Sequence, residues 1–249
     1  MSVVNQLPRD YILCEGASDA QFLCLYIENL FDYEYDSTLS RSYSSSIENS
    51  SFYYLKGNNR DLLVISCGGC CNISTLLDEI VRPSMKVNEN PARIIAVLDR
   101  DLKTDKECLR LLSCTDFIFS IGEWVDGKIN GNFIMPDGKY NEILWRTYLA
   151  IIPTGSPGSF ENVLIDSINS DNPEIVTEVS AFYDGLSKEA KKHIASPRKE
   201  IKARLDTMLL LINPEKLFES LKSLFSEIEL EEENIKKNYG FLSEVCNPM

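Results

Sequence analysis

The chain has 249 residues, a formal net charge of −13 and a hydrophobic content of 44%, which is the composition of an ordinary globular protein. This acidity argues against nonspecific nucleic-acid binding, which usually depends on a basic surface, but an acidic site can still meet phosphates through metal ions. Because no apolar run approaches the ~20 residues of a membrane span and the first ten residues lack a signal-peptide pattern, we expect a cytoplasmic protein without membrane contact.

The cysteine and histidine content further limits the metal sites and catalytic mechanisms that the chain can hold. Eight cysteines are scattered along the chain, several of them within apolar patterns, which is typical of buried reduced thiols. Cys67 and Cys70 form one C-x-x-C pair, but a structural zinc site requires a second pair, so we do not expect zinc. The single histidine, His193, excludes most Ser-His and Cys-His mechanisms unless it folds back into a site.

The first elements are predicted from apolar patterning. An apolar run over 10–14 predicts a buried strand. Ser18, with Gln21 three residues later, fits a capping box, and apolar residues at helical spacing predict a helix over 18–31. Residues 32–60 are rich in Ser, Tyr and Asn without a sustained period. They predict an insertion, which is either a partly disordered solvated loop or a flap over a site.

Alternating strands and helices define the fold class. Apolar runs over 62–66, 93–98 and 116–120 predict further strands, separated by helical patterns. Strands that are apolar throughout indicate a parallel sheet covered on both faces, which binds ligands beyond the carboxyl ends of its strands. Two Asp-Gly pairs within 121–140 predict a hairpin, and 148–153 predicts a fifth strand.

The rest of the chain is expected to be helical. Ser159 can cap a helix that has Glu161 in its first turn, and Asn213-Pro214 marks the start of a late helix. We therefore expect the α/β class, with a parallel sheet flanked by helices over 1–170 and a helical C-terminal subdomain over 171–249.

Acidic residues follow the first and third predicted strands. Glu15 ends the first strand, and Asp99 and Asp101 follow the third. If these strands are neighbours, the three carboxylates converge at one edge, where each disfavours ionisation of the others. A divalent cation such as Mg²⁺ relieves this repulsion, because it favours oxygen ligands and binds substrate phosphates. The alternative is that these acids only cap the adjacent helices.

Two neighbours of these acids are also candidates for the site. Gly16 lets the backbone turn sharply after Glu15 and leaves room for a ligand. Arg100 lies between the two aspartates, where it either contacts a phosphate or neutralises the acidic cluster.

These motifs resemble the TOPRIM domain, which is shared by topoisomerases, primases and the OLD-family nucleases. Residues 15–19 read E-G-A-S-D, a Gly-Gly turn at 68–69 precedes the second helix, and 158–161 reads G-S-F-E. With the D-R-D of 99–101, this order is similar to the OLD-like branch and to small stand-alone TOPRIM-like families of undefined function. The resemblance covers about 10–120 and, less fully, 148–168.

The resemblance implies a Mg²⁺- or Mn²⁺-dependent phosphoryl-transfer enzyme, best supported as a nuclease that acts on DNA or RNA. It assigns a first metal to the acids at the two strand ends, a second metal to two further acids, and stabilisation of phosphate charge to a C-terminal lysine. The ligands of the first metal are then Glu15, Asp99 and Asp101, and those of the second metal are Asp19 and Glu161. The lysine is Lys199 or Lys202. The alternative for Asp19 and Glu161 is that they only interact with a helix dipole, and the alternative for the two lysines is that they lie on a solvated helix face.

The chain also departs from the family. It has no Walker A motif, so the ATPase half of an OLD protein is absent and a separate ATPase partner is one expectation. A non-catalytic binding or regulatory module and a hydrolase of small phosphorylated molecules stay open as alternatives. A role in phage defence follows only by analogy with OLD-like proteins, and the sequence does not indicate an oligomeric state.

Overall fold

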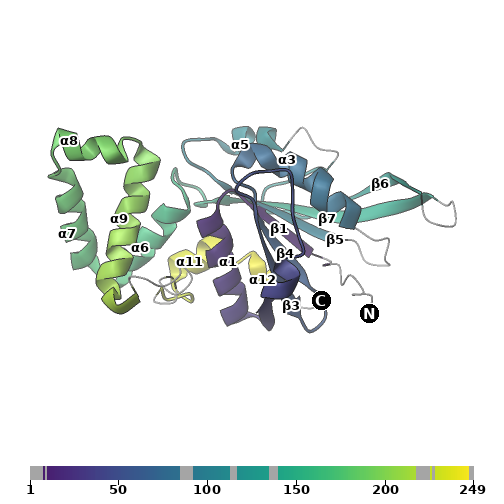
Figure 1. The fold of residues 1–249 in the computed structure, drawn as a ribbon, viewed down its shortest axis with the longest axis horizontal. Coiled ribbons are helices and arrows are strands. Elements are labelled where there is room, and N and C mark those ends of the chain that lie inside the picture. Colours follow the sequence, from purple (N-terminus) through teal and green to yellow (C-terminus); the bar gives the residue numbers. More distant parts are fainter. Residues whose placement is uncertain are drawn as a thin grey trace. The chain divides into compact units, whose positions relative to one another are not determined.

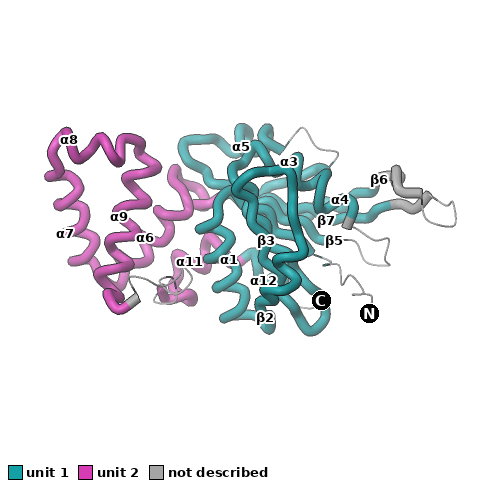
Figure 2. Tube along the Cα trace, viewed as in Figure 1, with its two compact units in different colours: residues 1–151, 241–249 teal, residues 152–240 magenta. Residues whose placement is uncertain are grey.

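A computed structural model describes residues 8, 10–84, 92–112, 117–134, 140–216, 225 and 228–246. The chain forms two compact units, one of residues 1–151 with 241–249 and the other of residues 152–240 (Figure 2). The expected boundary at residue 170 therefore lies inside the second unit. The reason is that the helix after residue 159 packs against later helices of that unit. Among the described helices, none is long and apolar enough to cross a membrane.

A seven-stranded mixed sheet with the order β2-β3-β4-β1-β5-β7-β6 forms the centre of the first unit (Figure 1). Strand β1 (Asp10–Cys14) lies between β4 (Leu62–Ser66) and β5 (Ala92–Asp99) and pairs with both in parallel. Every residue of β1 and β4 is buried, as expected for parallel strands covered on both faces. The expected α/β class is confirmed, with a parallel core and antiparallel edges.

Helices cover both faces of this sheet. Figure 1 shows α3 and α5 on one side of the sheet and α1 and α12 on the other. Helical segments of this unit come after strands β1, β4, β5 and β7 in the chain. They are α1 (Ala17–Leu30), η1 (Cys70–Asn72), α3 (Ile73–Leu76), the π-helical turn η2 (Leu77–Val81), α4 (Arg82–Ser84), α5 (Asp105–Leu111) and α12 (Leu242–Cys246).

Two local predictions about these helices are wrong. Helix α1 begins one residue before Ser18, because the Gly16 N–H bonds to the Asp19 carboxylate at 2.7 Å; the expected pairing of Ser18 with Gln21 is not the cap. The sequence also predicts that Pro83 ends the helix after residues 62–66, but helix α4 continues through Pro83 to Ser84.

The expected insertion over 32–60 is part of the sheet. It holds β2 (Tyr33–Asp36), α2 (Ser37–Ser40) and β3 (Ser51–Gly57), and β3 pairs antiparallel with both β2 and β4. The prediction of a disordered loop or flap is therefore wrong. These elements are too short to show a period in the sequence, but aromatic residues favour strands, and Tyr54 of β3 is fully buried.

The hairpin predicted over 121–140 is confirmed by the antiparallel pair β6 (Val125–Ile134) and β7 (Tyr140–Ile152). The predicted fifth strand is the end of β7, which begins earlier than expected. The strand predicted over 116–120 is wrong in its described part. Residues 117–120 belong to no strand, and the next residue, Ile121, pairs with Leu149 of β7 at an isolated bridge.

From residue 160 onward, the regular secondary structure described in the second unit is helical. Helix α6 packs against α7, α9 and α11, which confirms the expected helical C-terminal region. Its helical segments are α6 (Phe160–Asp171), α7 (Pro173–Asp184), α8 (Lys188–Lys191), η3 (Lys192–Ile194), α9 (Pro197–Ile212), η4 (Pro214–Lys216) and α11 (Glu233–Tyr239). The helix predicted after Asn213-Pro214 lies largely outside the described residues.

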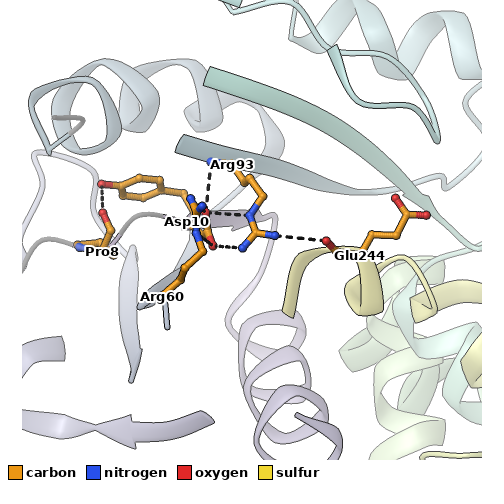
Figure 3. Close-up of polar contacts among 6 residues, drawn as sticks. Pro8, Asp10, Arg60, Arg93 and Glu244 are labelled. Atoms are coloured by element: carbon orange, nitrogen blue, oxygen red, sulfur yellow. Dashed lines mark hydrogen bonds and ion pairs between the residues drawn. The ribbon is translucent and has the colours of Figure 1, made fainter. Parts of the chain in front are cut away.

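A buried charge cluster fixes the amino end of the central strand. Asp10 is fully buried and is bound in bidentate fashion by Arg93 at 2.7 and 3.1 Å and by Arg60 at 2.8 and 2.9 Å. Arg93 also donates to the Glu244 carbonyl oxygen of α12 at 3.3 Å (Figure 3). The cluster therefore ties β1, β5 and the last helix together.

We predict that Asp10→Ala lowers the free energy of unfolding by about 3 kcal/mol or more, because it leaves the buried Arg93 without its carboxylate. Urea unfolding measures this change. The control is Asp126→Ala, which removes a carboxylate that is 75% exposed and pairs with Arg146, and it should cost at most about 1 kcal/mol. Equal, small losses in both variants would contradict the assigned role of Asp10.

Candidate functional site

The carboxyl ends of β1 and β5 bring two acidic residues together. The strands pair with Cys14 opposite Val97, so Glu15 and Asp99 follow at the same edge of the sheet. The Asp99 N–H donates to Glu15 Oε1 at 3.1 Å, and both residues are only 4% exposed. The expectation that the first and third predicted strands are neighbours is thus confirmed.

Asp101 lies two residues after Asp99, in a backbone turn. Its backbone adopts a left-handed conformation with φ of 50°, which aspartate tolerates better than most residues. The Lys103 N–H donates to the Arg100 carbonyl oxygen at 2.8 Å, and this turn brings Lys103 Nζ to 2.5 Å from Asp101 Oδ2. Arg100 itself pairs with Asp105, at the start of α5, at 2.5 Å.

Asp19 stabilises the start of helix α1, which is the role that the sequence offers as the alternative to metal binding. It lies in the first turn of α1, is 9% exposed and accepts the Gly16 N–H. Its charge reaches the end of β1: burial raises the pKa of the Cys14 thiol well above its usual value, and Asp19 and Asp99 raise that pKa further. A metal-ligand role for Asp19 stays a prediction.

The predicted Gly-Gly turn packs against the same edge. Gly68 and Gly69 have φ values of 65° and 131°, which favour glycine, and the Gly69 N–H donates to the Glu15 carbonyl oxygen at 2.9 Å. Burial, followed by the Glu15 charge, raises the pKa of Cys67 and Cys70. Both thiols are therefore less acidic than an ordinary cysteine.

Lys103 is the functional candidate that the sequence reasoning missed. Burial lowers its pKa, but the hydrogen bond to Asp101 and the charges of Asp101 and Glu15 raise it, and the net pKa lies above the usual value. Lys103 therefore remains an ammonium beside the acids. Its position two residues after the D-R-D motif is the signal that could have identified it.

The second unit holds the other residues that the TOPRIM resemblance singles out. Glu161, 3% exposed at the start of α6, accepts the Ser159 hydroxyl at 2.6 Å and pairs with Lys202 Nζ at 3.1 Å. Lys199 is exposed in the first turn of α9, where its N–H donates to Ser196 Oγ. His193 is also exposed. Of the two lysines, Lys202 is therefore the one that the structure places beside a buried acid.

The donor chemistry of the sheet edge suits a hard divalent cation. Glu15, Asp99 and Asp101 present carboxylate oxygens, which Mg²⁺ and Mn²⁺ accept. As the side chains stand, however, the described residues contain no group of three or more His, Cys, Asp or Glu that could hold a metal ion. The Asp101 carboxylate accepts a hydrogen bond from Lys103 Nζ.

The fold and this edge define an α/β protein with an acidic strand-end site. No protein-family model and no curated protein matches the chain. Among solved structures it is similar to the crystal structure of the hypothetical protein PH0156 from Pyrococcus horikoshii OT3. The two share 16% sequence identity with a TM-score of 0.45, over 96% of this chain and 99% of that chain.

We predict that Glu15→Gln and Glu15→Ala differ in stability when EDTA is present. Glutamine can still accept the Asp99 N–H and removes one of the crowded charges, so this variant should melt at or above the wild-type temperature. Alanine leaves the buried N–H without that acceptor, which costs about 1–3 kcal/mol.

Thermal and urea unfolding measure both effects, and Glu123→Ala, which removes an exposed acid, should change stability by no more than about 0.5 kcal/mol. Equal losses in the two Glu15 variants would show that the hydrogen bond and the charge repulsion are misassigned.

Proposed function

We propose that the chain is a TOPRIM-like enzyme that uses Mg²⁺ or Mn²⁺ to hydrolyse the phosphodiester bonds of DNA or RNA. The observation that carries the proposal is the hydrogen bond from the Asp99 amide to the Glu15 carboxylate. It connects two buried acidic residues at the ends of neighbouring parallel strands, which is the edge where α/β sheets bind their ligands.

The surroundings of these acids support the same proposal. The Gly68-Gly69 turn bonds to the backbone of Glu15, and its glycines leave the backbone accessible without side chains. The order of motifs along the chain resembles the OLD-like branch of TOPRIM proteins. A nuclease is therefore favoured over other phosphoryl-transfer enzymes.

In this proposal Glu15, Asp99 and Asp101 hold the ion, and Asp19 is a candidate ligand for a second one. When bound, such ions activate water and stabilise the charge of the leaving oxygen. The residues of the chain fix the geometry: the Asp99 N–H orients the Glu15 carboxylate, and Asp19 fixes the backbone at Gly16. Lys202 holds Glu161 in the second unit.

The chain's charge explains why a metal is needed. With a formal net charge of −13, the protein repels a polyanionic substrate over distances comparable with the Debye length. Cations bound to the acids would offset this repulsion locally. Since the chain has no Walker A motif, we also propose that any ATP-dependent step uses a separate ATPase partner.

One observation favours a second candidate, a non-catalytic TOPRIM-like module. Lys103 already supplies a positive charge at Asp101, and no three described acids are grouped to hold a metal ion. A lysine that stays in place would neutralise the edge and leave a scaffold for binding. The two candidates differ in whether added metal supports strand cleavage.

We predict that the purified protein nicks supercoiled plasmid DNA with Mg²⁺ or Mn²⁺ and that Asp99→Asn lowers the rate at least about 100-fold, because loss of a ligand removes several kcal/mol of charge stabilisation. Gel separation of nicked and supercoiled plasmid measures the rate, with a labelled single-stranded RNA as second substrate. Asp126→Asn, which changes an exposed acid, is the control and should cut at the wild-type rate. Undiminished cutting by Asp99→Asn would remove the site assignment, and no cutting by wild-type protein would favour the non-catalytic module.

A further inference from the structure

Lys103 places a positive charge on the last acid of the D-R-D motif. Its ammonium lies 2.5 Å from Asp101 Oδ2. The backbone turn fixes this approach, because the Lys103 N–H bonds to the Arg100 carbonyl oxygen at 2.8 Å. Asp101 follows two residues after Asp99, whose N–H bonds to the Glu15 carboxylate. The ion pair therefore engages one of the three carboxylates that the proposed metal requires.

This ion pair is built so that it can open. The side chains of Lys103 and Asp101 are 28% and 40% exposed, so an ammonium that leaves the carboxylate can be solvated without crossing the core. Ion pairs with this exposure are weak. A divalent cation carries twice the charge and can bind several carboxylates at once, which makes it a stronger partner for the acidic edge.

We propose that Lys103 gates metal binding at this edge: its ammonium holds the Asp101 carboxylate in the ion-free protein, and a divalent cation reaches Asp101 only by displacing it. This inference rests on the proposed function, because it concerns the same metal. Lys103 is thus a positioning residue that acts through Asp101.

The first test measures Mn²⁺ binding through the rise in melting temperature. Lys103→Met removes the competing charge and should lower the Mn²⁺ concentration for half-maximal stabilisation at least about threefold, the size expected for loss of a weak ion pair. Lys103→Arg keeps the charge and should retain a midpoint near that of the wild type. Lys106→Met, which removes an exposed lysine from α5, is the matched control and should leave the midpoint unchanged.

The second test uses wild-type protein, so it does not depend on the folding of a variant. Displacement by Mn²⁺ releases the Lys103 amine into solvent, and its acetylation by an amine-reactive reagent should become at least about twofold faster. Peptide mass spectrometry measures the rate, and Lys106 provides the internal reference whose rate should not change.

The outcomes separate this inference from the function on which it rests. The gating role is overturned if the Mn²⁺ concentration for half-maximal stabilisation of Lys103→Met is equal to or above that of the wild type. It is also overturned if Mn²⁺ does not change the acetylation rate of Lys103. Either result leaves the metal site intact. Absence of any Mn²⁺ effect on melting in all four proteins overturns both the gating role and the metal-dependent function.

Discussion

The parallel pairing of β1 with β5 is the constraint on which the structure of this edge depends. It places the residues after the two strands side by side and allows the Asp99 amide to bond to the Glu15 carboxylate. Without that register the two acids would lie at unrelated positions on the surface. With it, they share a nearly buried position, where like charges are costly. A fold that retains such an arrangement needs a compensating positive charge, and the nature of that charge decides what the site can do.

The two ends of β1 meet this need in different ways. At the amino end, Asp10 is fully buried and bound by Arg60 and Arg93, whose planar guanidinium groups bind carboxylates in a fixed bidentate geometry. That neutralisation is permanent and structural. At the carboxyl end, the lysine bound to Asp101 is partly exposed and has a flexible stem. This difference is consistent with a structural role for the first acid and an exchangeable cation at the second site.

The apolar runs were sufficient to predict the parallel core, because β4 and residues 94–98 of β5 are almost entirely apolar and are followed by turn or acidic residues. They also placed Glu15 and Asp99 at the same edge. Strand β3 could not be predicted, since its pairing with β2 and β4 depends on contacts outside its own short segment. The start of α1 was misplaced because the Asp19 carboxylate caps Gly16 in competition with Ser18. Lys103 was missed because its position depends on the left-handed turn at Asp101, which has no glycine to mark it.

Anomalous diffraction from crystals grown with Mn²⁺ tests the central claim most directly, because it locates the ion without any assumption about activity. The account predicts a manganese peak at the carboxyl edge of β1 and β5, about 2.2 Å from oxygens of Glu15 and Asp99, with the Asp101 carboxylate turned toward the ion. A crystal saturated with Mn²⁺ that shows no peak at this edge, with Lys103 still bound to Asp101, would contradict it.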